Sequence, residues 1–411
     1  MPQITPFKAI RPAKDKVAFV ASRSYEAYPE KERRYHLKYN PFSFLHIIDP
    51  GFKFHQIIVG EERFSLVRNR YLEFLEEKVL VKDTQSCFYL YQIQHQAGTS
   101  LGLFCATSVE DYDHQAIKKH EDTLEKREIL FAQYLKTVGF NAEPVLMTYP
   151  PNTTISTIIS KEVQKTPEYH FTTPDKVSHQ LWKIDTPSVI QTLQDAFGSL
   201  PHFYIGDGHH RSASSALLAK EMRDNNTSHT GKEPYNFFLS YLIPETDIQI
   251  SGFNRLIRDL NGLSKEAFLI QLDTHFRIEE QEGGIQQPIA KHHFCMYLDG
   301  AFYLLHLRKN RYQFTNALSA LDAQILYITI LQPILGIQDL RNDKRISYGQ
   351  GGNDLLHLKK RVDGGHFAVG FHLAPTTIDE IKAIADANLV MPPKSTYIEP
   401  KLRSGLAIYE I

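Results

Sequence analysis

The chain has 411 residues, 42% of them hydrophobic, and its 46 Lys and Arg against 47 Asp and Glu leave a formal net charge of -1. This length supports a sizeable core and two or three domains, whereas the balanced charge argues against a nucleic-acid-binding protein, which would show a basic excess. The three cysteines, Cys87, Cys105 and Cys295, are odd in number and widely spaced. They predict neither a disulfide framework nor a cysteine-rich zinc site.

The N-terminal stretch MPQITPFKAIRPAKDK lacks the apolar core of a signal peptide. No apolar run in the chain approaches the roughly 18 residues that a membrane span needs. From these two features we expect a cytoplasmic protein, in a reducing compartment, with no membrane partner.

The first part of the chain alternates strand and helix patterns, separated by Pro, Gly and Asn breaks. The predicted elements are a short strand ending at Pro12, a polar helix over Glu30–Tyr39, a strand over Phe42–Ile48, a helix within 63–80, a hairpin around Ala97 and Gly98, and a helix over 114–139 ending at Gly139.

The rest of the chain continues this alternation. Strands are predicted within 142–151, 170–184, 235–245, 293–307 and 365–374, helices within 187–200, 264–276, 320–335 and 377–387, a loop at 224–233 and a turn at 348–353. The mixture predicts an α+β protein with mixed sheets and helices. A boundary near residue 250 divides it into domains 1–250 and 251–411, and the end of the second could return to the functional site.

The sequence FYIGDGHHRSASSALLAKEM contains the densest group of candidate functional residues. An apolar strand meets a glycine turn, and a helix of small residues follows. The first helical turn offers unused N–H groups and a partial positive charge, which together favour phosphate. Arg211 adds a planar donor pair. The predicted phosphate-binding residues are Gly208, His209, Arg211 and Ser212.

Asp207 does not fit a pure phosphate cradle, because its charge repels the ligand. It indicates a metal ion, a general base or a hydroxyl-bearing substrate, although it could simply cap the helix. His210, beside Arg211, suits phosphate contact or proton transfer. The alternative for the whole stretch is a capped helix with surface histidines.

Other nucleotide and metal motifs are missing from the sequence. The stretch is neither a Walker A loop nor a dinucleotide fingerprint. The adjacent histidine pairs in GHHR and KHHF do not predict zinc, because neighbouring histidines rarely both bind one ion.

GDGHHR resembles the signature of the ParB/sulfiredoxin superfamily, and its D-G-H-H-R form resembles the ParB-like free-serine kinases. Sulfiredoxins carry a cysteine where this chain has His209, so sulfinic-acid reduction is not expected. Nearly the whole chain also resembles the domain-of-unknown-function 1015 (DUF1015) family. The segments that carry this resemblance are PFKAIRP, NPFSFLHI, IKKHEDT, YIGDGHHR, FNRLIRDL and MPPKSTYIEPKLRSGL.

The resemblance implies a ParB/sulfiredoxin-like core with insertions, and phosphoryl transfer between ATP or ADP and a small hydroxy amino acid, free serine or phosphoserine. Mg²⁺ would be held by phosphates and one or two carboxylates, with Asp207 as the candidate ligand. Glu26 is the candidate base for the substrate hydroxyl. It stands in SRSYEAY where relatives usually have Pro-Tyr-Asp, so its carboxylate lies one methylene further out and the loop geometry departs from theirs.

Two further stretches supply secondary candidates. His120 and Glu121 lie on the predicted 114–139 helix, where adjacent residues diverge by about 100° and cannot both face one site. Lys394 and Arg403, in the rigid C-terminal stretch, could bind an anion. The alternatives are a solvated helical face for the first pair and lysines lying along an apolar surface for the second.

Two other functions remain open at this point. The same anion site would serve a phosphoserine phosphatase, which needs no nucleotide-base pocket. A non-catalytic nucleotide-binding or partitioning protein would need a basic DNA-binding domain, which the sequence lacks. Independently of its function, the protein could form a homodimer.

Overall fold

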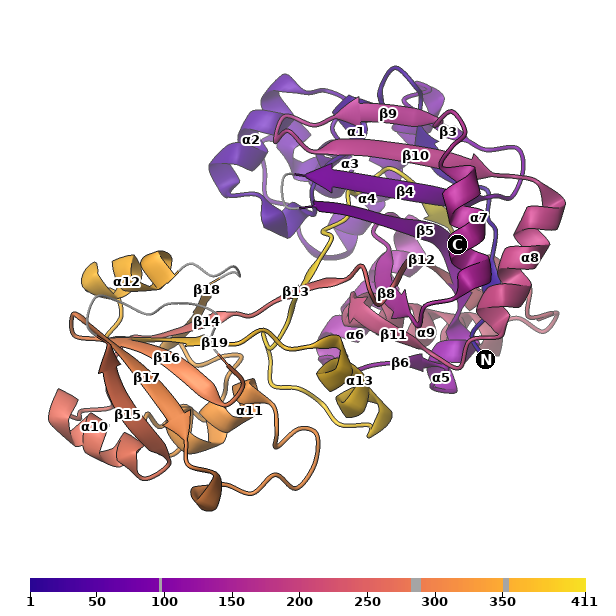
Figure 1. The fold of residues 1–411 in the computed structure, drawn as a ribbon. Coiled ribbons are helices and arrows are strands. Elements are labelled where there is room, and N and C mark those ends of the chain that lie inside the picture. The colour runs from indigo at the N-terminus through magenta and orange to yellow at the C-terminus, as the bar shows by residue number, and fades with distance from the viewer. Residues whose placement is uncertain (96–97, 282–289, 350–354) are drawn as a thin grey trace. The chain divides into compact units, whose positions relative to one another are not determined.

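The computed structural model describes residues 1–95, 98–281, 290–349 and 355–411. The chain forms two compact units (Figure 1). Unit 1 contains Met1–Lys118, Thr123–Ile248 and Pro400–Ile411, and unit 2 contains Lys119–Asp122 and Gln249–Glu399. The C-terminal residues therefore belong to the same unit as the N-terminal part of the chain.

A mixed sheet forms the centre of unit 1, and within the described residues it has nine strands in the order β6-β11-β8-β12-β5-β4-β10-β9, with β1 beside β5. The pairs β11–β6 and β12–β8 are parallel, and the others are antiparallel. The strands are β1 (Ile4–Thr5), β4 (Phe88–His95), β5 (Gly98–Ser108), β6 (Ile117–Lys118), β8 (Val145–Tyr149), β9 (Tyr169–Thr172), β10 (Ser178–Ile184), β11 (Phe203–Asp207) and β12 (Phe237–Pro244).

Helices and two short strand pairs surround this sheet. The helices are α1 (Val17–Val20), α2 (Glu30–Tyr39), α3 (Leu45–Ile48), α4 (Gly60–Glu76), α5 (Val109–Asp113), α6 (Glu125–Val138), α7 (Thr153–Glu162), α8 (Pro187–Gly198) and α9 (His209–Asp224). The strand pairs are β2 (Ile10–Pro12) with β3 (Leu80–Lys82), and β7 (Phe140–Asn141) with β21 (Tyr409–Glu410). The main core packs Leu193 and Phe197 of α8 and Ile155 of α7 on the sheet residues Phe203 and Leu242. This apolar packing holds β11 rigidly.

Unit 2 is built on a sheet whose described strands are all antiparallel, in the order β15-β17-β16-β19-β14-β18. Asp299 and Gly300, both at positive φ, form the tight turn between β16 and β17, as a two-residue hairpin requires. The elements are β13 (Gln249–Ser251), β14 (Asn254–Ile257), α10 (Lys265–Asp273), β15 (Phe276–Gln281), β16 (His293–Leu298), β17 (Ala301–Leu307), α11 (Asp322–Leu326), a π-helix (Tyr327–Leu331), β18 (Ile346–Gly349), α12 (Leu355–Asp363), β19 (Val369–Leu373), α13 (Ile378–Asp386) and β20 (Tyr397–Glu399).

The α+β class expected from the sequence is confirmed, as are the helices at α2, α4, α8 and α13 and the hairpin of β4 and β5. Ala97, and residues 350–353 of the expected 348–353 turn, lie outside the described residues. None of the helices in the described ranges combines the length and the apolar character that crossing a membrane requires.

Two predicted elements are wrong. The strand expected at 42–48 is a turn followed by α3, because Phe44 and Ile47 both pack into the cluster around Phe64 and Val67 of α4. In a strand, Phe44 and Ile47 would point to opposite faces of the sheet, so the two side chains could not both pack into that cluster.

The helix expected over 114–139 is confined to α6. Residues Ile117 and Lys118 pair with β11 instead, and Leu124 is extended immediately before the helix. His120 and Glu121 therefore lie in an irregular segment, and the argument about helical divergence does not apply to them.

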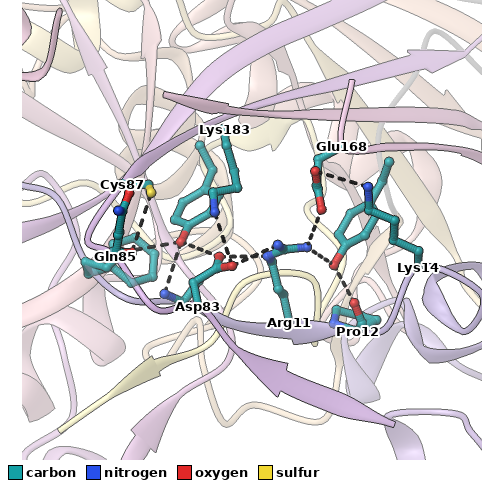
Figure 2. A network of polar contacts seen from close by, with 12 residues as sticks. Arg11, Pro12, Lys14, Asp83, Gln85, Cys87, Glu168 and Lys183 are labelled. Atoms are coloured by element: carbon teal, nitrogen blue, oxygen red, sulfur yellow. Dashed lines mark hydrogen bonds and ion pairs between the residues drawn. The ribbon is translucent and has the colours of Figure 1, made fainter. Parts of the chain in front are cut away.

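A buried polar network links the N-terminal strand β2 to the sheet (Figure 2). Arg11 donates from Nε and Nη2 to the carboxylate of Asp83, at 2.7 and 2.8 Å, and from Nη1 to the hydroxyl of Tyr169. The Tyr89 hydroxyl also donates to Asp83, at 2.8 Å, and Lys183 Nζ lies 3.3 Å from the Asp83 carboxylate. Arg11 and Asp83 are 7% and 8% exposed, so this pair is a structural anchor shielded from solvent.

Candidate functional site

The turn between β11 and α9 has the geometry of an anion site. Gly208 caps the helix in the left-handed region, with φ 102° and ψ 27°. The amides of Arg211 and Ser212 donate to its carbonyl at 2.9 and 3.1 Å, which starts the helix. The first turn of any helix leaves N–H groups that the helix does not use, and the dipole makes this end positive.

Three charged side chains gather at this turn. Arg211 Nη2 lies 3.1 Å from Asp207 Oδ2, and Lys401 Nζ lies 3.7 Å from the same oxygen. Each of the three side chains is between one third and one half exposed, so solvent can reach all of them. Two cations share one carboxylate, and the cluster therefore keeps a net positive charge beside the positive end of α9.

The C-terminal segment and the β8 loop hold this cluster in place. Arg211 Nη1 donates to the carbonyl of Pro144, and Ser404 Oγ donates to Glu143 at 2.9 Å. Ser404 also pairs through its backbone with Ser22, in the loop that precedes Glu26. Lys401 thus contacts Asp207 from a segment that Ser404, three residues later, fixes to unit 1.

The remaining residues of the motif differ in exposure. His210 is half-buried, whereas His209 is buried. Ser212 is fully buried, and its hydroxyl donates to the carbonyl of His209 at 3.0 Å, so it supports the helix backbone here. A phosphate contact from Ser212 stays a prediction, and it would require that hydroxyl to leave its present acceptor.

Glu26 lies on a short 3-10 helix, Tyr25–Ala27, in unit 1. It is exposed, and within the described residues it makes no hydrogen bond or ion pair. Its link to the cluster at Asp207 runs through the backbone pairing of Ser22 with Ser404. The carboxylate is available to a substrate, but no contact joins it to Asp207.

Arg403 belongs to a different part of unit 1. Its guanidinium lies 2.6 Å from Asp175 and donates to Thr173 at 3.3 Å, at the turn between β9 and β10. Thr173 also contacts His179, which is stacked between Phe171 and Tyr91. The side chain of Arg403 is 8% exposed, so it is committed to this buried network.

This network predicts an acid-sensitive stability. Burial, assisted by the charge of Arg403, lowers the pKa of His179 from 6.5 to about 3. Between these values the unfolded chain binds more protons than the folded one, so stability falls as the pH drops. The slope reaches about 1.4 kcal/mol per pH unit. We expect His179→Gln to flatten urea-denaturation stability between pH 6.5 and 4, while His170→Gln, at an exposed position on β9, leaves the slope unchanged.

The other candidates, His120, Glu121 and Lys394, belong to unit 2. The His120 carbonyl accepts from Met391 at 2.9 Å, and the Lys394 ammonium lies over the Phe253 ring. The Lys394 carbonyl accepts from the buried Arg255. These contacts fix the C-terminal PPKST segment within unit 2. The functional roles expected for His120, Glu121 and Lys394 stay predictions.

Asp207 alone is a poor magnesium site. No group of three or more His, Cys, Asp and Glu side chains among the described residues could hold a metal ion. Asp207 itself is flanked by two cations, which compete with a metal for its oxygens. Mg²⁺ often takes only one or two carboxylates and completes its shell with phosphates and water. Magnesium bound to Asp207 therefore stays a prediction that depends on a bound nucleotide.

Gly208 offers a direct test of the turn geometry. A Cβ there would lie 3.2 Å from Arg211 Cζ and 3.3 Å from Val145 Cα, at a φ that side chains rarely adopt. We expect Gly208→Ala to lower the free energy of unfolding by about 1–2 kcal/mol, measured by urea denaturation. Gly198→Ala, at the end of α8 with nothing near its Cβ, should be neutral or slightly stabilising.

The model of the family described as "Protein of unknown function (DUF1015)" matches residues 4–324. The chain belongs to the DUF1015 family. The family expected from the sequence segments is thus confirmed. The likeness of the D-G-H-H-R turn to ParB-like serine kinases stays a prediction. A search of curated proteins found no match to this DUF1015 protein.

Several solved structures share a distant likeness in fold with this DUF1015 protein. A free serine kinase variant in complex with AMP is 11% identical, with a TM-score of 0.38 over 75% of this chain and 91% of that one. SbnI with a C-terminal truncation, from Staphylococcus aureus, is 12% identical, with a TM-score of 0.39 over 74% and 85%. A conserved hypothetical protein from Pyrococcus furiosus is 11% identical, with a TM-score of 0.35 over 75% and 94%. Likenesses this distant carry no argument about activity.

Proposed function

We propose that this DUF1015 protein transfers a phosphoryl group between a nucleotide, ATP or ADP, and a small hydroxy amino acid. Free serine is the first acceptor to test, because the D-G-H-H-R turn resembles the ParB-like serine kinases. The observation that carries the proposal is the solvent-accessible cluster of Asp207, Arg211 and Lys401 at the positive end of α9.

The cluster suits a phosphate chain. The phosphate oxygens would accept from the amides of the first turn of α9, with Arg211 across two of them and Lys401 as a point charge. Asp207 keeps both cations in place before the ligand arrives, so their reorganisation costs little. His210, half-buried next to Arg211, would contact a phosphate or pass a proton.

The transfer step requires few other groups, because positioning and charge neutralisation dominate phosphoryl transfer. Glu26 would accept the proton of the serine hydroxyl as its oxygen attacks the terminal phosphorus, and the nucleotide would leave with one phosphate fewer. A magnesium ion, when bound with the nucleotide, would neutralise phosphate charge. The exposure of Glu26 and its freedom from ion pairs with described residues support its role as base.

Phosphorus-31 NMR of the purified protein tests the proposal. Phosphoserine and Mg²⁺ are supplied with and without ADP. Formation of ATP only in the presence of ADP supports reversible serine kinase activity. Release of inorganic phosphate without nucleotide would replace the proposal with a phosphoserine phosphatase, which the same anion site could serve. An unchanged spectrum, also with ATP and serine, would overturn both.

A further inference from the structure

Unit 2 contains a pocket that the proposed function does not use. Its volume is about 630 Å³, which is within the range of small-molecule sites. Among the described residues, the lining is strongly basic and includes no acidic side chain. It consists of Arg258, His357, Lys360, Arg361, Gly364, His366 and Phe367.

The fold places these residues together through the packing of α12, which is labelled in Figure 1. Leu358 and Val362 anchor the helix in a cluster with Leu256 and Tyr297. A Cβ at Gly370 of β19 would lie only 2.7 Å from Leu358, so this glycine permits the close approach. The outward residues of α12, Lys360 and Arg361, are thereby turned toward the pocket.

A glycine turn brings the remaining residues to the pocket. Gly365 adopts φ 72° after the last turn of α12, and its amide donates to the Val362 carbonyl at 2.9 Å. The chain then returns through His366 and Phe367, and the Arg361 guanidinium lies 5.0 Å from the Phe367 ring centroid. Arg258 comes from a separate element, immediately after β14.

The three permanent cations of the pocket are not neutralised by the described residues. Arg258, Lys360 and Arg361 make no ion pair with any of them. Nearby acids are committed elsewhere, because Asp363 pairs with Lys359 at 2.5 Å and Asp259 lies 3.6 Å from Arg345. Placing like charges in one pocket is unfavourable, so a bound anion would relieve the repulsion.

Part of this charge has a simpler explanation, since cations near a helix C-terminus complement its dipole. Lys360 and Arg361 are so placed on α12. Arg258 is not on that helix, and the dipole carries only about half a charge against three full cations. The pocket therefore keeps an excess of positive charge after the helix end is satisfied.

We propose that this pocket binds a small anion carrying a diphosphate group. The guanidinium groups of Arg258 and Arg361 match phosphate oxygens in pairs, and Lys360 adds a third charge. The site lies wholly in unit 2 and does not depend on the cluster at Asp207. It gives the chain a second place for phosphate-bearing ligands.

Isothermal titration of the full-length protein with pyrophosphate tests the proposal. The titration is made in the Arg211→Ala background, so that binding at the α9 turn does not contribute. We expect one equivalent to bind, and to weaken as salt is raised. Replacing Arg258, Lys360 and Arg361 with glutamine should weaken binding by about tenfold or more. Lys309→Gln with Arg311→Gln, at exposed positions elsewhere in unit 2, is the matched control and should bind as before.

Three outcomes would overturn the proposal: no pyrophosphate binding in the Arg211→Ala background, equal binding by the glutamine and control variants, or far tighter binding of a single-stranded RNA than of any small diphosphate. The exposed single variant Lys360→Gln provides the comparison if the triple variant does not fold. Titration with ADP separates two sources of the same chemistry: tighter binding than pyrophosphate identifies a nucleoside diphosphate, and equal or weaker binding identifies the diphosphate group alone.

Discussion

Arg211→Ala is expected to reduce phosphoryl transfer by about 10²–10³-fold, as the loss of a single donor to transition-state charge does in other enzymes. The guanidinium contacts Asp207 and the Pro144 carbonyl, and these contacts hold it beside the N-terminal end of α9. Alanine removes the planar donor pair and, among the described residues, leaves Asp207 paired with Lys401 alone. The rate of ATP formation from phosphoserine and ADP measures the effect.

The same helix supplies a matched control for this variant. Arg223, near the other end of α9, pairs with Asp113 at 3.4 Å on the surface. Arg223→Ala removes an identical side chain from the same helix and should leave the rate within about twofold, because exposed pairs contribute little. The rate of Arg211→Lys should lie between those of the two alanine variants, because lysine keeps the positive charge but lacks the planar pair of donors. Equal rates for Arg211→Ala and Arg223→Ala would contradict the proposed site.

Asp83→Ala is expected to lower the free energy of unfolding by about 3 kcal/mol, the low end for a broken buried pair, because the buried Arg11 keeps only Glu168, 3.1 Å from its Nη1. Urea denaturation at neutral pH measures this loss. Asp15→Ala is the control, since Asp15 is an exposed acid that pairs with Lys16, and its loss should leave the free energy of unfolding nearly unchanged. Asp83→Asn, which retains an acceptor oxygen but no charge, should lie between them.

The difference in the free energy of unfolding between Asp83→Ala and the unchanged protein should become smaller at acidic pH. Burial alone would raise the pKa of the Asp83 carboxyl, but hydrogen bonds from Arg11 and Tyr89 outweigh it and lower the pKa below its usual range. A carboxyl with a depressed folded pKa contributes stability above its unfolded pKa, and that stability is lost as the pH falls through the folded value. A difference that stays constant down to pH 2 would contradict this account of the pair.

Long periodic segments of the fold could be predicted from the sequence. Strand and helix patterns in the sequence predicted β4, β5 and β10 and the helices α2, α4 and α8, because such patterns depend only on neighbours along the chain. The segment at 42–48 was misread, since its apolar run is equally compatible with a buried strand and a buried turn of helix. Packing against α4 decided it.

The helix prediction for the first part of the 114–139 segment was wrong for a different reason. Ile117 and Lys118 have no strong strand signal, and they become β6 only because β11 lies beside them. That pairing moves His120 and Glu121 out of the helix on which they were expected. Helix α7 was missed, although Asn152 caps it by accepting from the Ile155 amide at 3.1 Å, a signal visible in the sequence.

The same distinction applies to the candidate site, where one part followed from the sequence and another depends on the tertiary structure. The sequence by itself determined the strand–glycine–helix turn with Asp207 and Arg211, because strand, left-handed glycine and helix start are all local properties of adjacent residues. Only the tertiary structure decided that Lys401 joins Asp207 while Arg403, two residues later, pairs with Asp175. In a regular strand, residues 401 and 403 would point to the same side, so their different partners follow from the elements that this irregular segment crosses. That contact between distant parts of the chain is set by packing, which no local pattern encodes.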